Sequence, residues 1–353
     1  MSIGLGLMAL GALLFIPAAL MRTYYMFLIG LFVQGSGLAI LQTAANPYIT
    51  ILGPSESAAK RMSIMGISNA VAGVIAPLVL GAIVLNDSEE VKNRLASLVT
   101  AQKIMELDML AKRVIVPYLV MAAILVVLAV FIYYSRLPEI DAEKENEAEV
   151  TGDTFKKSIW QFPHAVIGVF ALLLYVGVEV IAGNTVINYA SSQGVSLENA
   201  KFFTSCTLAG MLVGYIVGII TIPKYISQQK ALTICAVSGL IFSICAIFTN
   251  GYLSVVFITL LGLSNSLIWP SIWPLALEGL GRFTKIGSSL LIMAIGGGAL
   301  LPLLYGFLAD HSSERTAYWM LIPCYGFIFY YAVSGHLVKY WQRAGIKKTL
   351  INQ

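Results

Sequence analysis

The sequence predicts an all-α protein that crosses a membrane many times. Of its 353 residues, 58% are hydrophobic and only 11% are charged, and the mean hydropathy is +0.83. Soluble domains carry about a quarter charged residues, so this composition excludes a water-soluble globular fold. The long apolar stretches do not alternate with polar residues, as the strands of a membrane barrel do. Helices are therefore the expected spanning elements.

Ten apolar segments are long enough to cross a bilayer core, which needs about 20 helical residues. They lie at residues 2–20, 24–51, 62–86, 112–135, 162–190, 199–222, 229–249, 252–277, 286–309 and 316–340. The longer ones are expected to tilt, to bend or to project beyond the hydrocarbon. The first segment has no basic residue before it and no cleavage site after it, so we interpret it as a helix that stays in the protein rather than a secretory signal.

Two of the connections are long. Residues 137–158 are acidic and polar, which is typical of a solvated linker. This linker divides the chain into an expected four-helix bundle, 1–136, and a six-helix bundle, 159–353. Residues 87–113 carry apolar positions at helical spacing, which predicts a surface helix at the outer face; these positions are Val91, Leu95, Leu98 and Val99.

The distribution of basic residues predicts that both termini, and the linker, are cytoplasmic. With Met1 inside, the inner connections and the carboxy-terminal tail hold 14 Lys and Arg residues, and the outer connections hold 8. Cytoplasmic loops carry the excess of positive charge. Five of the eight outer residues lie in the long connection 87–113, where this rule counts for less.

Several classes of function are excluded by what the sequence lacks. The net charge of +4 is small and scattered, so nucleic acid is not an expected partner. The four cysteines lie in apolar stretches without a CxxC spacing, so neither a metal site nor a disulfide framework is expected; they are Cys206, Cys235, Cys245 and Cys324. No convergent acids or His–nucleophile pair are visible, so an enzyme is not expected.

Glu179 is the one charged residue deep inside an apolar segment, "AVIGVFALLLYVGVEVIAGNTVINY". An acidic side chain at mid-membrane costs roughly 2.5–3.5 kcal/mol on insertion scales, so it normally faces a cavity or a partner and marks a transport path. No Lys or Arg within the apolar segments is available to pair with it. Coupling to a proton or a sodium ion is therefore expected, and the alternative is a protonated acid that only ties helices together.

Amides and indoles recur on one face of particular segments. Gln42 and Asn46 are four residues apart, and so are Asn265, Trp269 and Trp273 in succession. Amides supply donors and acceptors together, which suits vicinal hydroxyls, and an indole gives a flat apolar surface for a pyranose ring. A sugar site is the prediction, and tryptophan packing against a neighbouring helix is the alternative. Pro270 and Pro274 are expected to bend this helix.

The fifth segment is harder to interpret. Asn184 and Asn188 are four residues apart, but Glu179 lies about 140° and 180° from them at 100° per residue. Either Gly183 marks a break in the helix or Glu179 has a separate task. Asn69, in the third segment, is a further candidate for sugar binding or for a simple interhelical hydrogen bond. The Gly210, Gly214 and Gly218 ridge predicts close helix packing.

Four stretches carry a resemblance to a known family. "LQTAANPYITILGP", "RMSIMGISNAVAGVIAP", "LYVGVEVIAGN" and "SNSLIWPSIWPLALEGLGRFTKIGSSLLIMAIGGGALLPLLYG" resemble the glucose/galactose transporter branch of the fucose permease family, in the major facilitator superfamily. The resemblance extends over essentially the whole chain. It implies sugar–cation symport by alternating access, with twelve helices in two six-helix bundles and a cavity lined by helices one, four, seven and ten.

Under that resemblance the second, fifth and eighth segments correspond to family helices four, seven and ten, and helices one and two have no counterpart. Fucose permeases place an acidic residue in helix one, which leaves Glu179 as the only buried coupling candidate. They also carry Glu where Gln42 stands and Gln where Gly66 stands. These departures favour a hexose such as glucose or galactose over fucose.

The resulting expectation is a cation-coupled symporter of a neutral hexose in a bacterial inner membrane. H⁺ or Na⁺ is the coupling ion, and no cofactor or metal is expected. The expected partners are a small-molecule sugar and the lipid bilayer, without an obligate protein partner. One alternative is a truncated, inactive transporter fragment, poorly stable when expressed from Met1. A less favoured one is a polytopic enzyme acting on lipid-linked sugar.

Overall fold

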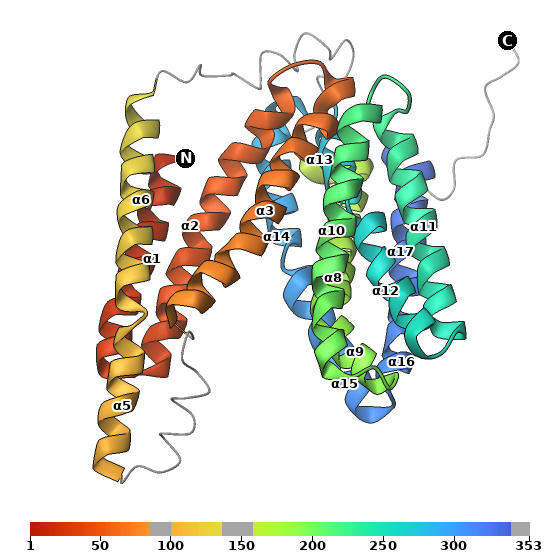
Figure 1. Cartoon of the computed structure of the whole chain (residues 1–353). Helices are drawn as coiled ribbons and strands as arrows, with labels where there is room; N and C mark the ends of the chain where they lie inside the picture. The colour runs from red at the N-terminus through yellow and green to blue at the C-terminus, as the bar shows by residue number, and fades with distance from the viewer. Residues whose placement is uncertain (85–99, 136–157, 340–353) are drawn as a thin grey trace, which may run out of the picture. The chain divides into compact units, whose positions relative to one another are not determined.

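The computed structural model of the chain describes residues 1–84, 100–135 and 158–339. Every regular element in those ranges is a helix (Figure 1). Within the same ranges, nine helical stretches are long and apolar enough to cross a membrane. The remaining predicted segment, 62–86, forms α3 (Ala58–Val84), and its last two residues lie outside the described ranges. The prediction of an all-α polytopic membrane protein is therefore confirmed.

The chain divides into two compact units. The first consists of Met1–Tyr48 and Ser68–Ile140, and the second of Ile49–Ile67 and Asp141–Gln353. The predicted linker, 137–158, lies almost entirely outside the described residues, so the predicted bundle boundaries stay a prediction. In its described part, the first unit holds four complete or nearly complete helices besides part of α3: α1 (Ser2–Met21), α2 (Tyr24–Ile51), α5 (Thr100–Lys112) and α6 (Ile115–Tyr134).

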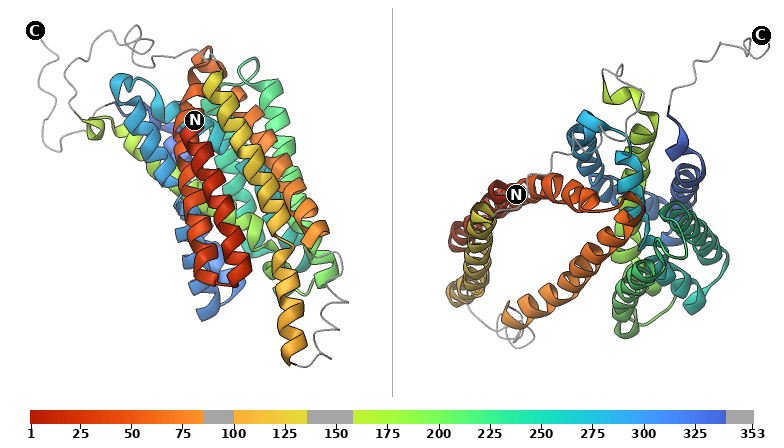
Figure 2. Two further views of the ribbon diagram at one scale, coloured as in Figure 1. Left: turned by 90° about the vertical axis from the view of Figure 1, so that its left-hand side faces the viewer. Right: turned by 90° about the horizontal axis from the view of Figure 1, so that it is seen from above.

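Close backbone approach holds the helices of the first unit together. A Cβ atom on Gly4 of α1 would lie 2.8 Å from the carbonyl oxygen of Gly37 on α2, so only a residue without a side chain fits there. Along α6, which runs beside α1 (Figure 2), the ring of Tyr118 stacks on Phe15 with 4.2 Å between centroids. Small residues let helices pack closely in a membrane, where apolar burial alone does not drive association.

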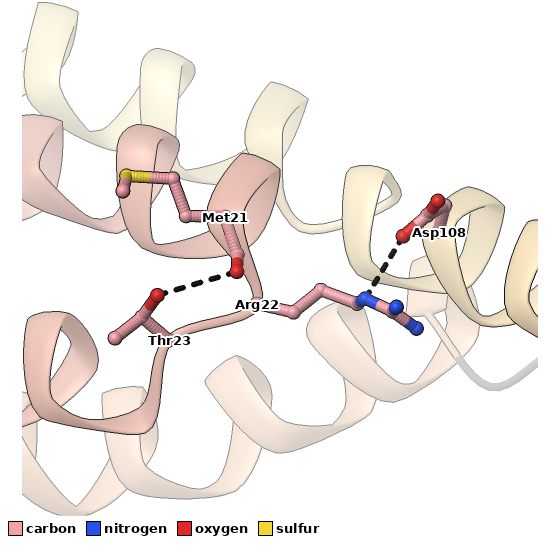
Figure 3. A network of polar contacts seen from close by, with 4 residues as sticks. All are labelled: Met21, Arg22, Thr23 and Asp108. Carbon is pink, nitrogen blue, oxygen red and sulfur yellow. Dashed lines mark hydrogen bonds and ion pairs between the residues drawn. The ribbon is translucent and has the colours of Figure 1, made fainter.

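The turn between α1 and α2 is short and carries an ion pair (Figure 3). Arg22 has a φ of 47°, in the left-handed region, and its side chain reaches Asp108 on α5 with 2.9 Å between Nε and the carboxylate. Thr23 Oγ1 donates to the Met21 carbonyl at 3.2 Å. The helix α5 lies within the predicted surface helix 87–113, whereas Val91, Leu95, Leu98 and Val99 lie outside the described residues.

The second unit contains ten α-helices in its described part. They are α8 (Pro163–Asn184), α9 (Val186–Ser192), α10 (Leu197–Thr221), α11 (Gln228–Phe248), α12 (Gly251–Asn265), α13 (Ile268–Leu277), α14 (Thr284–Ala294), α15 (Gly297–His311), α16 (Glu314–Ala317) and α17 (Leu321–Val333). Short 3₁₀ turns occur at Ser55–Ser57, Ile159–Gln161, Gly281–Phe283, Tyr318–Met320 and Gly335–Leu337. Four of the six predicted segments in this unit are thus interrupted helices.

The interruption between α12 and α13 follows from one proline. Pro270 has no backbone N–H, and its ring clashes with the carbonyl four residues earlier, which is that of Ser266. The helix accordingly ends at Asn265 and resumes at Ile268. Pro274 lies inside α13 without a break. The bend expected in this segment therefore falls one turn before Pro270.

The glycine ridge of α10 packs against the end of α12, as the sequence predicts. A Cβ on Gly210 would lie 3.3 Å from the backbone nitrogen of Leu263, and one on Gly214 would overlap the hydroxyl of Ser266. A Cβ on Gly218 would overlap the side chain of Leu267. The ridge thus supports the residues that connect α12 to α13.

Candidate functional site

The nine residues predicted to form the site fall in both units. Gln42, Asn46 and Asn69 lie in the first unit, and the others lie in the second: Glu179, Asn184, Asn188, Asn265, Trp269 and Trp273.

In the first unit, the three amides differ in accessibility. Asn46 is only 2% exposed, Gln42 one turn earlier on α2 is half-buried, and Asn69 on α3 is exposed. Gln34, on the preceding turns of α2, donates to the sulfur of Met121 on α6 at 3.8 Å. Of the three predicted amides in this unit, Gln42 and Asn69 are therefore more accessible than Asn46.

In the second unit, Glu179 lies among tyrosines. Tyr175 is one turn earlier on the same face of α8, and the two side chains interact. The hydroxyls of Tyr215 on α10 and Tyr325 on α17 lie within electrostatic range of the same carboxyl, and all three rings are buried. We call Tyr175, Tyr215 and Tyr325 the Glu179 tyrosines. Among the residues described, no basic side chain forms an ion pair with Glu179.

Asn265 holds one of these tyrosines in place. The hydroxyl of Tyr325 donates to its side-chain oxygen at 2.7 Å, and Asn265 is 1% exposed. The ring of Tyr325 fits there because Gly239 on α11 has no side chain, and a Cβ would lie 2.6 Å from ring atom Cδ1. In this structure Asn265 therefore orients Tyr325, and its side-chain oxygen is already occupied.

The two indoles of α13 stack on each other but differ in exposure. Their centroids are 5.5 Å apart, with an angle of 20° between the ring planes. Trp273 is fully buried, and its indole N–H has no hydrogen-bond partner among the described residues. Trp269 is partly exposed. Trp269 is thus the more accessible of the two indoles, with Trp273 packed against it.

Asn184 and Asn188 lie on either side of the interruption between α8 and α9, and both are exposed. The break falls at Thr185 rather than at Gly183. Because Glu179 lies before the break and Asn188 after it, one straight helix does not fix their relative direction. The structure is therefore compatible with separate roles for the two amides and for the Glu179 carboxyl.

Sequence reasoning missed the Glu179 tyrosines. Tyr175 was within reach of that reasoning, because it is four residues before Glu179 and shares its helix face. Tyr215 and Tyr325 come from other helices, and no periodicity in the sequence connects them to Glu179. In the ranges that the structure covers, no three His, Cys, Asp or Glu side chains gather as metal ligands do.

Comparison with known proteins places this arrangement in context. Residues 1–290 match the family described as the Major Facilitator Superfamily. The chain is 36% identical over 336 residues to the glucose/galactose transporter of Brucella abortus biovar 1 (strain 9-941), covering 94% of this chain and 77% of the relative. It is 29% identical over 340 residues to the L-fucose-proton symporter of Escherichia coli (strain K12), covering 93% and 76%.

The fold is also shared with solved structures. The crystal structure of the transporter FucP in the outward conformation matches with a TM-score of 0.80 at 28% identity, over 94% of this chain and 81% of that chain. The proton:xylose symporter XylE matches with a TM-score of 0.62 at 14% identity, which is a likeness of fold alone. These similar proteins are transporters and not enzymes.

Proposed function

The chain belongs to the Major Facilitator Superfamily, and on that premise we propose that it is a proton-coupled symporter of a neutral hexose. It works by alternating access in a bacterial inner membrane, with both termini in the cytoplasm. The observation that supports coupling most directly is the carboxyl of Glu179 among three buried tyrosines, without a basic partner in the described part of the chain. A proton that binds there neutralises a charge that is costly inside a membrane.

Proton coupling fits this site better than sodium coupling. Hard cations bind several oxygen atoms that converge on one point, whereas phenol hydroxyls donate hydrogen bonds to a carboxylate. Tyr325 also has its hydroxyl directed at Asn265, which holds the ring in one orientation. The relative from Escherichia coli, named an L-fucose-proton symporter, supports the same choice of ion.

A neutral hexose fits the remaining polar groups. Trp269 offers an indole face for the apolar side of a pyranose ring. In the same unit, the amides of Asn184 and Asn188 offer donors and acceptors for its hydroxyls. In the first unit, the amides of Gln42 and Asn69 are the predicted groups of the same kind. The higher identity to a glucose/galactose transporter than to a fucose symporter supports glucose or galactose as the sugar.

The carboxyl is tested by Glu179→Gln, which keeps the shape of the side chain and removes its titratable charge. Uphill accumulation of D-glucose or D-galactose in vesicles with a proton gradient is expected to vanish, because no proton is then carried. Exchange of the same sugar without a gradient is expected to persist. The control is Glu56→Gln, an exposed acid in the 3₁₀ turn after α2, which should accumulate sugar normally. Unchanged accumulation by Glu179→Gln would contradict the coupling role.

A further inference from the structure

The short helix α9 is held at three points by side-chain hydrogen bonds. It contains only seven residues, and a helix of that length does not hold its own direction in isolation. Its direction is therefore set by what it contacts. These contacts are made at Thr185, before its first residue, at Tyr189 in its middle, and at Gln193, just past its end.

The first contact joins Thr185 to Tyr318. The Thr185 hydroxyl donates to the carbonyl of Ile181 at 2.7 Å, and its oxygen lies 2.6 Å from the hydroxyl of Tyr318. Because a threonine hydroxyl has one proton, Tyr318 must be the donor of the second bond. Tyr318 is fully buried, so its ring holds Thr185, and hence the break between α8 and α9, in a fixed place.

The other two contacts join α9 to α11 and α12. The Ser254 hydroxyl donates to the carbonyl of Ala246 at 2.5 Å and forms a 2.5 Å hydrogen bond with the hydroxyl of Tyr189, in which either oxygen can be the donor. The Tyr189 hydroxyl also lies 3.4 Å from the Ala246 carbonyl. The ring of Tyr189 also packs edge-on against Tyr318, with 4.7 Å between centroids. The side-chain oxygen of Gln193 accepts from the backbone N–H of Gly251 at 3.2 Å.

Residues 184–189 carry hydrogen-bonded side chains that face the protein and amides that are exposed. Tyr189 is buried and Thr185 half-buried, whereas their chain neighbours Asn188 and Asn184 are exposed. The contacts that fix Thr185 and Tyr189 therefore also fix the directions of Asn184 and Asn188, which are their neighbours in the chain.

We propose that Thr185 and Tyr318 are positioning residues for sugar binding, since their hydrogen bond sets the direction in which Asn184 and Asn188 point. The proposal rests on the proposed function in taking a hexose as the ligand of those amides. Neither Thr185 nor Tyr318 needs to touch the sugar.

The test compares Thr185→Val and Tyr318→Phe with two matched controls. Thr259→Val removes a hydroxyl that donates only to the carbonyl four residues earlier, at 2.9 Å. Tyr331→Phe removes a buried hydroxyl that has no partner among the described residues. Thr185→Ser keeps the hydroxyl and serves as the rescue variant. All are measured at equal membrane levels.

The first readout is exchange of D-glucose and D-galactose. Thr185→Val and Tyr318→Phe are expected to raise KM about 3- to 10-fold, the change that corresponds to one net hydrogen bond, with little change in the maximal rate. Thr185→Ser and both controls should keep the KM of the unaltered chain. An unchanged KM in both variants, or an equal rise in the controls, would overturn the proposal.

The second readout does not depend on the sugar. Asn188→Cys is alkylated with a membrane-impermeant maleimide, and the chain without this substitution gives the background from the exposed Cys206. Adding Thr185→Val is expected to change the alkylation rate several-fold, because α9 loses the first of its three anchors. An unchanged rate overturns the positioning role. If neither sugar is exchanged but this rate changes, the hexose assignment fails and the positioning of α9 stands.

Discussion

At the scale of single residues, the two tryptophans of α13 have different surroundings and hence different expected tasks. Trp273 is fully buried, and Trp269 is partly exposed with the other indole stacked behind it. The sequence places both on one helix face and so predicts that both can contact sugar. Only the structure distinguishes the accessible indole from the buried one.

The substitutions Trp269→Ala and Trp273→Ala are therefore expected to have different effects. Trp269→Ala should weaken hexose affinity about tenfold or more, on the scale of about 1–3 kcal/mol for losing a stacking ring, and leave thermal stability nearly unchanged. Trp273→Ala should lower stability by about 3–5 kcal/mol, because it leaves a cavity. The measurements are sugar affinity and thermal unfolding in detergent. A stable Trp273→Ala chain with weak binding, beside a normal Trp269→Ala chain, would reverse this assignment.

The sequence predicts a site residue when that residue is unusual within its own helix. It does not predict one whose role arises only from packing against other helices. Glu179 stands out because a lone carboxyl in an apolar segment is costly. Tyr215 and Tyr325 do not stand out, because tyrosine is common in membrane helices and their relation to Glu179 arises only when α10 and α17 pack beside α8. The spacing of Asn265 predicts a sugar-binding residue. It does not indicate that Asn265 accepts a hydrogen bond from Tyr325 and so orients that ring.

At the scale of helices, the predicted segments and the observed ones differ mainly in their interruptions. The break before α13 can be inferred from Pro270, since the clash with the carbonyl four residues earlier is local. The break at Thr185 has no proline to mark it. This break lies where Thr185 is hydrogen-bonded to Tyr318, 133 residues away in the chain. The local sequence therefore does not predict it.

Two glycines within helices are expected to respond to alanine with opposite signs. Replacing a helical glycine by alanine gains about 1 kcal/mol from propensity when there is room. Gly306 on α15 has no atom within 4 Å of its Cβ position, whereas at Gly214 that position overlaps the Ser266 hydroxyl. Gly306→Ala should therefore raise the melting temperature in detergent, and Gly214→Ala should lower it, because overpacking costs about 1–3 kcal/mol. Equal shifts in both variants would contradict the packing of α10 on α12.

At the scale of the whole molecule, the boundary between the two units does not follow the ends of the helices. Residues 49–67 belong to the second unit although α2 begins in the first. Arg61 organises this short stretch. Its guanidinium donates to the carbonyls of Ile49 at 2.9 Å and Pro54 at 3.0 Å, and to the hydroxyl of Ser57 at 2.6 Å. Through its bonds to the carbonyls of Ile49 and Thr50, one side chain thus satisfies groups that the end of α2 leaves unpaired.

The proposed orientation in the membrane is testable with two exposed lysines. The candidate span Met105–Tyr134 covers 30 residues, about 45 Å at about 1.5 Å per helical residue, which exceeds a hydrocarbon core of about 30 Å. Its charged residues, Glu106, Asp108, Lys112 and Arg113, all lie in its first part. Lys103 on α5 should therefore lie outside the bilayer on the outer side, and Lys224, after α10, on the inner side. A membrane-impermeant amine reagent applied to intact cells should modify Lys103 at once and Lys224 only after permeabilisation. The opposite order would invert the proposed topology.

The interruption between α12 and α13 has a consequence for the electric field around it. A helix carries a partial negative charge at its carboxyl end and a partial positive charge at its amino end, each about half an elementary charge. At Ser266 and Leu267 the carboxyl end of α12 and the amino end of α13 are only two residues apart, so the two partial charges largely cancel at a distance. What remains close by is a set of carbonyl acceptors beside a set of N–H donors. Ser266 and Leu267 are buried, so these groups act inside the protein and the interruption adds no net charge to the surroundings of the two helices.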